Sequence, residues 1–388
     1  MRLARSLTAL SLLFFHGVLA ANFTLVKEYS GGTFFDDWIF DEYSYDNTTG
    51  GSVNYVTKAN SSSLAYVNDA TNRVIIKVDN TSFVPYNFKR NSVRIATKDF
   101  FSIGTVWLID AVHIPFGCSV WPSIWTKGNA WPDNGEIDII EGVNRNPLNQ
   151  MALHTNHGCF ATTKTNALNQ PTITDCNSTD NSGCTVPEST PNSFGQLFAN
   201  NGGGVWATQF DVSGIFIWFW GRSHVPPSVT TATDSLDISS WGPPSAAYVS
   251  SSCNIPDFFG AQQIVIDITL CGIWAGNPAL YAAQCGGNAT DPSTCVSHVV
   301  WYNGTSDYAN AYFELNSIRA FSVNSTPVVD SNGSSASAGA PSTSPTSSGP
   351  GSGGSGSGTI DTSEGVALSP RGLYAATIAL CFIAAILM

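Results

Sequence analysis

Apolar and polar side chains alternate with a period of two through most of residues 22–323, and Gly, Pro and Asn interrupt this pattern at short intervals. Such alternation is typical of strands with one buried face, and almost no 3.6-residue periodicity of an amphipathic helix is present. The clearest strand-like runs are Arg73–Val78, Ser92–Lys98, Thr105–Ile114, Glu136–Ile140, Gln150–Thr155, Ile215–Trp220, Gln263–Leu270 and Ala311–Val323. Many short strands without intervening helices predict a single all-β domain with a β-sandwich fold.

Two departures from the alternation refine this prediction. In Ile215–Trp220 every side chain is large and apolar, which predicts a strand that is covered on both faces. Residues 160–204 are rich in Asn, Thr, Ser and Pro, so we expect long loops pinned by disulfides there.

The two ends of the chain have the patterns of targeting segments. Residues 1–20 carry Arg2 and Arg5, an apolar run and a small-residue cleavage site, which predicts a secretory signal peptide. Residues 324–363 form a Ser/Gly/Thr/Pro-rich stretch that predicts a flexible stalk. Residues 364–388 end in an apolar tail with no basic residue after it, which favours a GPI-anchor signal. Ser357 and Ser363 are both acceptable attachment positions, and Ser363 is preferred because Gly365 follows two residues later. A tail-anchored membrane helix is the alternative.

Cysteine usage agrees with an extracellular location. Of nine cysteines Cys381 lies in the predicted tail, and the eight others are Cys118, Cys159, Cys176, Cys184, Cys253, Cys271, Cys285 and Cys295. An even number in a secreted chain predicts disulfides, with 105 connectivities open. No pair has the Cys-x-x-Cys spacing of a zinc site, and we expect no metal.

Composition narrows the classes of partner. Only 11% of the residues are charged, the formal net charge is −12, and no basic block occurs, so a nucleic acid is excluded as a partner. Nine Asn-x-Ser/Thr sequons predict N-glycosylation sites at Asn22, Asn47, Asn60, Asn80, Asn177, Asn288, Asn303, Asn324 and Asn332. We expect a glycosylated, secreted monomer that is held at the cell surface or cell wall and meets a membrane only through its GPI anchor.

The densest chemistry lies in the segment Asn-Gly-Glu-Ile-Asp-Ile-Ile-Glu-Gly at residues 134–142. Glu136 and Asp138 are two residues apart, so they share one face of a strand. Glu141 would lie on the opposite face, unless a β-bulge around Ile139–Ile140 returns it to the first face. An edge strand with protective charges is the structural alternative.

Clustered carboxyl groups of this kind can cleave a glycosidic bond, because one can hold a proton while another stays ionised. With the bulge counted as one lost step, the Cα atoms of Glu136 and Glu141 would be roughly 13 Å apart at ~3.3 Å per residue. Two inward-leaning Glu side chains can close this to the ~5–5.5 Å of a retaining enzyme.

The string GEIDIIEGVN, with Trp131-Pro132 before it and Leu153-His154-Thr155 after it, resembles glycoside hydrolase family 16. Within the family it is most similar to fungal endo-1,3(4)-β-glucanases (laminarinases). The resemblance continues through WPSIWTKG, GIFIWFWGRSHVP, CGIWAGN and AYFELNSIRAF, and so spans most of residues 22–323. It implies a catalytic domain at residues 21–323 with a concanavalin-like β-jelly-roll fold and an open glycan-binding cleft.

The resemblance also implies residue roles. By position, Glu136 resembles the nucleophile, Glu141 the general acid/base, and Asp138 a residue that assists the nucleophile. The predicted substrate contacts are Trp121, Trp125, Trp131, His154 and Trp274, whereas Trp218 and Trp220 are assigned to packing.

The implied function is retaining endo-hydrolysis of a neutral 1,3- or mixed 1,3/1,4-β-glucan. A cell-wall glucan transglycosylase and an inactive glucan-binding lectin are the alternatives. We expect no cofactor; some family members carry a structural calcium ion, but no loop of oxygen ligands for one can be assigned here. Linkage preference stays open, because it depends on loops whose conformation the sequence does not determine.

Overall fold

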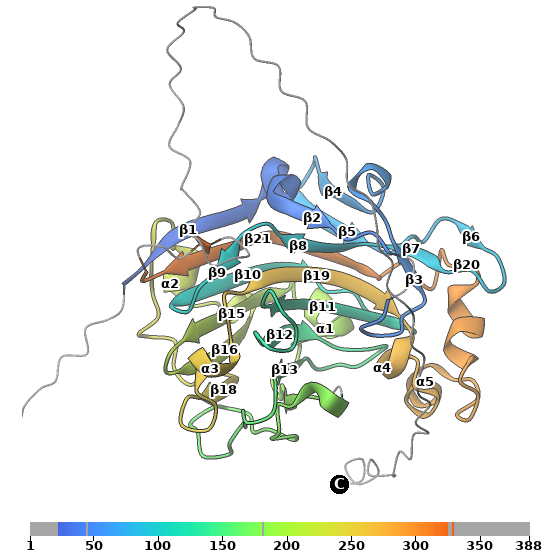
Figure 1. Cartoon of the computed structure of the whole chain (residues 1–388). Helices are drawn as coiled ribbons and strands as arrows, with labels where there is room; N and C mark the ends of the chain where they lie inside the picture. The colour runs from blue at the N-terminus through green and yellow to red at the C-terminus, as the bar shows by residue number, and fades with distance from the viewer. Residues whose placement is uncertain (1–21, 44–45, 181, 325–327, 330–388) are drawn as a thin grey trace, which may run out of the picture. The chain divides into compact units, whose positions relative to one another are not determined.

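The computed structural model describes residues 22–43, 46–180, 182–324 and 328–329. Two large antiparallel sheets face each other across an apolar core (Figure 1). The predicted signal peptide, the anchor signal, most of the stalk, Asn332 and Ser363 lie outside the described residues. Within those ranges, no helix has the length and apolar character that crossing a bilayer requires.

The first sheet, sheet A, has nine strands. Its main order is β17-β1-β21-β10-β15-β16-β18, with β5 paired to β21 and β4 paired to β5. The strands are β1 (Asn22–Ser30), β4 (Ala65–Asn68), β5 (Arg73–Lys77), β10 (Thr105–His113), β15 (Gly204–Asp211), β16 (Gly214–Gly221), β17 (Ser235–Asp237), β18 (Ala246–Val249) and β21 (Tyr312–Ser322).

The second sheet, sheet B, has seven strands in the order β14-β13-β12-β11-β19-β8-β2. They are β2 (Trp38–Phe40), β8 (Arg94–Thr97), β11 (Val120–Lys127), β12 (Glu136–Glu141), β13 (Gln150–His154), β14 (Cys184–Pro187) and β19 (Gln263–Leu270). Each of the eight strand-like runs of the sequence overlaps one of the strands of sheets A and B, so the predicted all-β sandwich is confirmed.

Short elements connect and cover the sheets. The two-stranded pairs are β3 (Val53–Tyr55) with β7 (Arg90–Ser92), β6 (Phe83–Val84) with β20 (Tyr302–Asn303), and β9 (Phe100–Phe101) with β22 (Val328–Val329). The α-helices are α1 (Gly195–Asn200), α2 (Pro227–Thr230), α3 (Ile255–Phe258), α4 (Gly272–Ala275) and α5 (Pro278–Cys285). There are also 3-10 turns at Gly31–Asp37, Lys58–Asn60, Ser178–Asp180 and Arg222–His224, and a π-helical turn at Val296–Val300.

The prediction for residues 160–204 was wrong in part, because this segment contains β14 and α1 as well as loops. Its Cys-Thr-Val-Pro strand is only four residues long, too short to show an alternation. Helix α1 has six residues, fewer than two turns, and so leaves no 3.6-residue pattern to read.

The main core fills the space between the sheets with residues of both. Trp107, Trp206 and Phe210 project into it from sheet A, and Ile124 and Ile266 project into it from sheet B. All five side chains are at most 1% exposed. Close packing of this kind supplies most of the apolar burial that stabilises the domain.

Strand β16 is covered on both faces, as the sequence predicted. Ile215 and Ile217 belong to the main core, whereas Trp218 belongs to a second apolar cluster on the opposite face of sheet A. Trp241 closes this second cluster, with its ring 5.1 Å from that of Trp218 and 5.0 Å from that of Trp220. Trp218 and Trp220 are therefore packing residues, and sheet A lies between two apolar layers.

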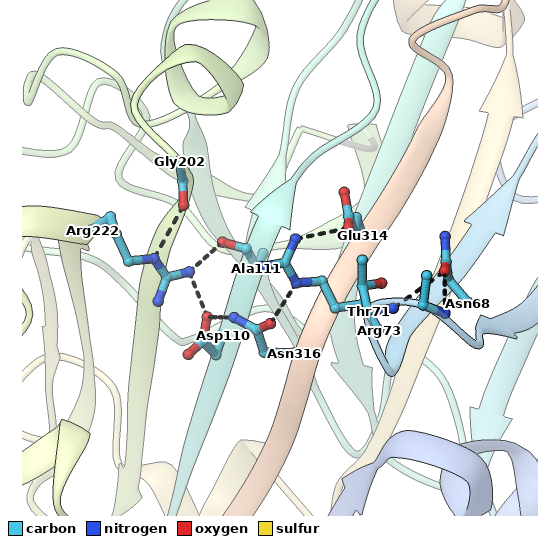
Figure 2. A network of polar contacts seen from close by, with 10 residues as sticks. Asn68, Thr71, Arg73, Asp110, Ala111, Gly202, Arg222, Glu314 and Asn316 are labelled. Carbon is cyan, nitrogen blue, oxygen red and sulfur yellow. Dashed lines mark hydrogen bonds and ion pairs between the residues drawn. The ribbon is translucent and has the colours of Figure 1, made fainter.

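A network of polar side chains links β5, β10 and β21 of sheet A to the 3-10 turn that follows β16 (Figure 2). The Arg222 guanidinium donates to Asp110 at 2.5 Å, and the Asn316 amide donates to the same carboxylate oxygen at 2.9 Å. Arg73 donates to Asn316 at 3.1 Å and to Glu314 at 3.1 Å. Arg222 is paired with Asp110 and Arg73 with Glu314, so the charges of this network balance one another without a ligand.

The eight cysteines outside the predicted tail form four disulfides, as expected for an oxidising compartment. The pairs are Cys118–Cys285, Cys159–Cys253, Cys176–Cys184 and Cys271–Cys295. Two of them join residues 94 and 167 positions apart, so they restrict the unfolded chain strongly.

Candidate active site

The three carboxylates lie on β12, which is paired between β11 and β13 (Figure 1). Asp138 pairs with Trp125 of β11, but Ile140 pairs with Ile124, so Ile139 is one extra residue without a partner of its own. The predicted β-bulge is therefore confirmed, and it is placed at Ile139.

The bulge puts the carboxylates on the outer face of sheet B, away from the core. Ile137 and Ile140 are fully buried in the main core. Beyond the bulge, Glu141 pairs with Ser123 and accepts a hydrogen bond from its hydroxyl at 3.2 Å. A regular strand would have turned Glu141 toward the core, where its charge has no solvent.

Asn149 holds the bulge in place. Pairing between β12 and β13 stops at Asp138, so the backbone groups beyond it need other partners. The buried Asn149 side chain accepts a hydrogen bond from the Glu141 N–H at 2.9 Å and donates one to the Ile139 carbonyl at 2.9 Å. One amide thus replaces the missing ladder hydrogen bonds and fixes the backbone that carries Glu141.

The environment of Glu141 favours its protonated form. Burial raises the pKa of this carboxyl to about 7, although the hydrogen bond from the Trp121 indole opposes the shift. That indole N–H donates to Glu141 Oε1 at 2.8 Å. Glu136 adds to the shift because a second negative charge nearby disfavours ionisation. Glu141 can therefore hold a proton near neutral pH and release it to a neighbouring oxygen.

Asp138 and His154 form the buried centre of the site. Their side chains are 3% and 13% exposed, and His154 Nε2 lies 3.3 Å from Asp138 Oδ2. Burial raises the pKa of Asp138, and the charges of Glu136 and Glu141 raise it further. Burial alone would lower the pKa of His154, but Glu136 and Asp138 outweigh it and raise the pKa to about 10. An imidazolium therefore partly neutralises the carboxylates at neutral pH.

Glu136 is positioned by the loop that precedes it. The indole N–H of Trp131, a residue 45% exposed, donates a hydrogen bond to Glu136 Oε2. Gly135 has φ +72°, and a Cβ at this position would lie 2.2 Å from the Phe259 ring. Only glycine therefore lets the chain pass under Phe259 and enter β12 with Glu136 in place.

The other tryptophans predicted to contact substrate differ in how far their rings are buried. Trp121 meets the half-buried Trp274 edge to face, with ring centroids 5.4 Å apart. Trp125 is only 6% exposed, its N–H donates to Asp267 at 2.7 Å, and the Arg94 guanidinium carbon lies 5.0 Å from its ring centroid. Most of the Trp125 ring thus contacts protein. Sugar contact by the five predicted residues stays a prediction.

Sequence reasoning missed several residues that build the site. Asn149 stands just before a strand and gave no signal, because its role depends on a bulge in the neighbouring strand. Asp267 did give one: it is the only charge in the apolar run Gln263–Leu270. Burial raises its pKa to about 6, although Arg94 opposes the shift. Ser123 and Arg94 could be placed only from the strand register.

Among the described residues, Glu136, Asp138 and His154 bring ligand-type atoms within 4.8 Å of one another. His154 also provides a positive charge beside Asp138, which balances part of the negative charge of the carboxylates. The expectation that the protein needs no cofactor stays a prediction, and a structural calcium ion stays an open alternative.

The sequence of the domain matches one family model and is similar to fungal glycosidases. Residues 38–321 match the family model described as the XgeA-like, catalytic GH16 domain. A probable glycosidase of Schizosaccharomyces pombe is 34% identical over 308 residues, which cover 78% of this chain and 70% of that protein. The endo-1,3(4)-β-glucanase XgeA of Emericella nidulans is 33% identical over 349 residues, or 87% of this chain and 53% of that protein. The chain thus spans about half the length of the latter relative.

Two solved structures resemble the whole described domain. GH16 laminarinase 16A from Phanerochaete chrysosporium, solved with β-glucans in its donor and acceptor sites, has a TM-score of 0.70 and 33% identity. An elongating GH family 16 β-1,3-glucosyltransferase has a TM-score of 0.71 and 34% identity. Each comparison covers 77% of this chain, and 99% and 100% of the other chain respectively.

The role of Asn149 generates a first prediction. We expect Asn149→Ala to slow cleavage of a natural glycan about tenfold or more, because Glu141 would move out of line with the leaving oxygen. An aryl glycoside with a good leaving group needs little acid assistance, so its cleavage should fall much less. The matched control is Asn316→Ala, which removes two side-chain hydrogen bonds on sheet A. Equal losses on both substrates would contradict a positioning role.

The raised pKa of Glu141 generates a second prediction, on stability. Its value of about 7 in the folded state lies above the ~4.3 of an unfolded Glu, so the native protein loses stability as pH rises through this window. Glu141→Gln mimics the protonated acid and should gain stability relative to wild type between pH 4 and pH 8. We expect a gain of about 1 kcal/mol or more, at about 1.4 kcal/mol per pKa unit. Urea unfolding of both proteins at pH 4 and pH 8 measures it; a difference that does not change with pH would refute the shift.

Proposed function

The chain belongs to glycoside hydrolase family 16, and from this premise we propose that it is a retaining endo-β-glucanase. Its proposed substrate is a neutral 1,3- or mixed 1,3/1,4-β-glucan. The observation that carries the proposal is the pair of Glu side chains across the bulge, of which Glu141 has a pKa of about 7 and Glu136 is held by Trp131.

In the first step, Glu136 attacks the anomeric carbon and Glu141 gives its proton to the departing glycosidic oxygen. The bond from the anomeric carbon to this oxygen breaks, and a covalent glycosyl ester forms on Glu136. In the second step, Glu141 takes a proton from water, which displaces Glu136 from the sugar and retains the β configuration. Asp138 assists by binding and orienting the nucleophile, and the His154 imidazolium limits the repulsion among the carboxylates.

Substrate recognition is proposed to use Trp131, the Trp121–Trp274 pair, Trp125 and His154. The exposed Trp131 offers an indole face on which the C–H groups of a glucose ring can stack, next to the nucleophile. The structural likeness to laminarinase 16A, which holds β-glucans in donor and acceptor sites, supports this use of the face.

Transglycosylation is the second candidate function, because the elongating β-1,3-glucosyltransferase is as similar in structure as the laminarinase. The same glycosyl ester would then be intercepted by a sugar hydroxyl in place of water. A glucan-binding lectin is disfavoured, since the site keeps both carboxyl groups and their hydrogen-bond partners.

We also propose that the protein is secreted and carries a GPI anchor and N-linked glycans. Four disulfides among the described residues favour the oxidising route, and the two terminal segments have the required patterns.

The proposed mechanism is tested by Glu136→Gln and Glu141→Gln. On laminarin we expect the second change to lower kcat by about 10²–10⁴-fold, the usual worth of a general acid, and the first change to cost at least as much. With an activated aryl glycoside and added azide, only Glu141→Gln should recover turnover and yield a β-glycosyl azide. Near-normal laminarin hydrolysis by either variant would overturn the roles. Oligosaccharides longer than the substrate would favour the transferase, and no reducing-sugar release by wild type would favour the lectin.

The anchor is tested with the full chain produced in its secretory route. Treating the membranes with a phosphatidylinositol-specific phospholipase should release the protein into the soluble fraction, since the lipid would be its only hold on the membrane. Replacing Ser363 and Gly365 by bulky residues should block anchoring. Protein that stays with the membrane after treatment would indicate the tail-anchored helix.

A further inference from the structure

Two neighbouring loops expose a group of large aromatic side chains. Phe83, Tyr86 and Phe88 on one loop are 65%, 68% and 63% exposed, and Tyr302 on the other is 49% exposed. The Phe83 and Tyr302 rings are 5.8 Å apart, and Tyr86 lies 4.5 Å from the half-buried Trp301. We call these five residues the aromatic patch. Single exposed rings are common, but four large exposed rings on two paired loops indicate that something covers them.

The backbone beneath the patch is rigid. Arg90 is fully buried and holds both loops through hydrogen bonds to the carbonyls of Asp79, Ser82, Val300 and Tyr302, at 2.7–3.2 Å. Tyr302 has φ +71°, a left-handed conformation that is unfavourable for a bulky residue. A Cβ on Gly304 would lie 2.9 Å from the Arg90 guanidinium carbon, so the loop closes tightly on this cation. The rings are therefore held on a preorganised surface.

A sequon lies within this surface. Strands β6 and β20 pair Phe83 directly with Asn303, the first residue of Asn303-Gly304-Thr305 (Figure 1). Directly opposed residues have Cβ atoms about 4.5–5.5 Å apart. Asn303 is exposed, and its Oδ1 accepts hydrogen bonds from the Thr305 N–H at 3.0 Å and the Thr305 hydroxyl at 2.6 Å. In the described part of the chain Nδ2 has no hydrogen-bond partner, so it is available for a substituent.

We propose that an N-linked glycan on Asn303 covers the aromatic patch, with its first N-acetylglucosamine on the Phe83 ring. The linkage forms when Asn303 Nδ2 attacks C1 of an oligosaccharyl diphosphate lipid. The C1–O bond breaks, the diphosphate lipid leaves, and Nδ2 loses one proton. A pyranose ring presents a face of C–H groups, which packs on an aromatic face while its hydroxyls stay in water. Because the sugar is tethered next to Phe83, this contact costs little association entropy.

Two other sequons in the described residues, at Asn288 and Asn324, lack this combination. Asn288 accepts the same two hydrogen bonds from Thr290, at 3.0 and 2.9 Å, but the surrounding segment Gly286–Thr290 contains no aromatic residue. Asn324 uses Nδ2 to bond the Ile103 carbonyl, so a glycan there would have to break this bond. Asn288 is therefore the matched control, and the inference rests on the proposed secretory route alone.

The test uses the full chain secreted from a eukaryotic host. Glycopeptide mass spectrometry should find Asn303 occupied, and Asn303→Gln should lower Tm by about 2–4 °C. Thr305→Ala, which keeps the asparagine, should have the same effect, and trimming to a single N-acetylglucosamine should leave Tm unchanged. In a Phe83→Ser background, loss of the glycan should no longer lower Tm. Asn288→Gln should leave Tm within 1 °C of wild type, a shift of about 0.3 kcal/mol.

An unoccupied Asn303, or a loss in Tm that is equal with and without Phe83, would overturn the proposal. So would retardation of the glycosylated protein in a laminarin gel that Phe83→Ser abolishes, because the patch would then be open to polymeric glucan. Laminarin hydrolysis measured on the same samples separates the proposed enzyme function from the proposed glycan cover. If the wild type is inactive but its glycan still stabilises the protein through Phe83, only the proposed enzyme function is overturned.

Discussion

The extra residue at Ile139 is the constraint on which the site depends. A regular strand of six residues cannot bury Ile137 and Ile140 and also direct Glu136, Asp138 and Glu141 outward, because its faces alternate strictly. The bulge satisfies both needs at the cost of interrupted backbone pairing. Because the pairing is interrupted, the buried Asn149 side chain must supply the missing hydrogen bonds. The packing of the core, the path of the backbone and the placement of Glu141 therefore depend on one another.

Electrostatics adds a second constraint. Asp138 is almost completely buried between two Glu carboxylates, and the nearest positive partner is His154. Such a cluster opposes folding near neutral pH, so the stability that offsets it must come from elsewhere. The described domain provides it through the apolar core between the sheets and the long-range disulfides Cys118–Cys285 and Cys159–Cys253.

The local sequence pattern was enough to predict the features that depend on neighbouring residues, namely the strands and the bulge. Apolar runs located β16 and β19, and the odd spacing of Glu136 and Glu141 predicted the bulge that the strand register contains. The missed features depend on contacts between distant segments. Arg94 reaches Trp125 only because β8 and β11 both flank β19, and cysteine pairing depends on where loops meet. Helices α1 and α4 are shorter than two turns, so they leave no periodicity in the sequence.

The double apolar cover of sheet A has a consequence for how this scaffold can evolve. Trp218 and Trp241 cover one face of sheet A and the main core covers the other, whereas the three carboxylates lie on sheet B. Sheet B contributes one face to the core and leaves its other face to the reaction. Exposed residues on that face, such as Trp131, contribute little to the apolar core, so they can be exchanged without a new fold.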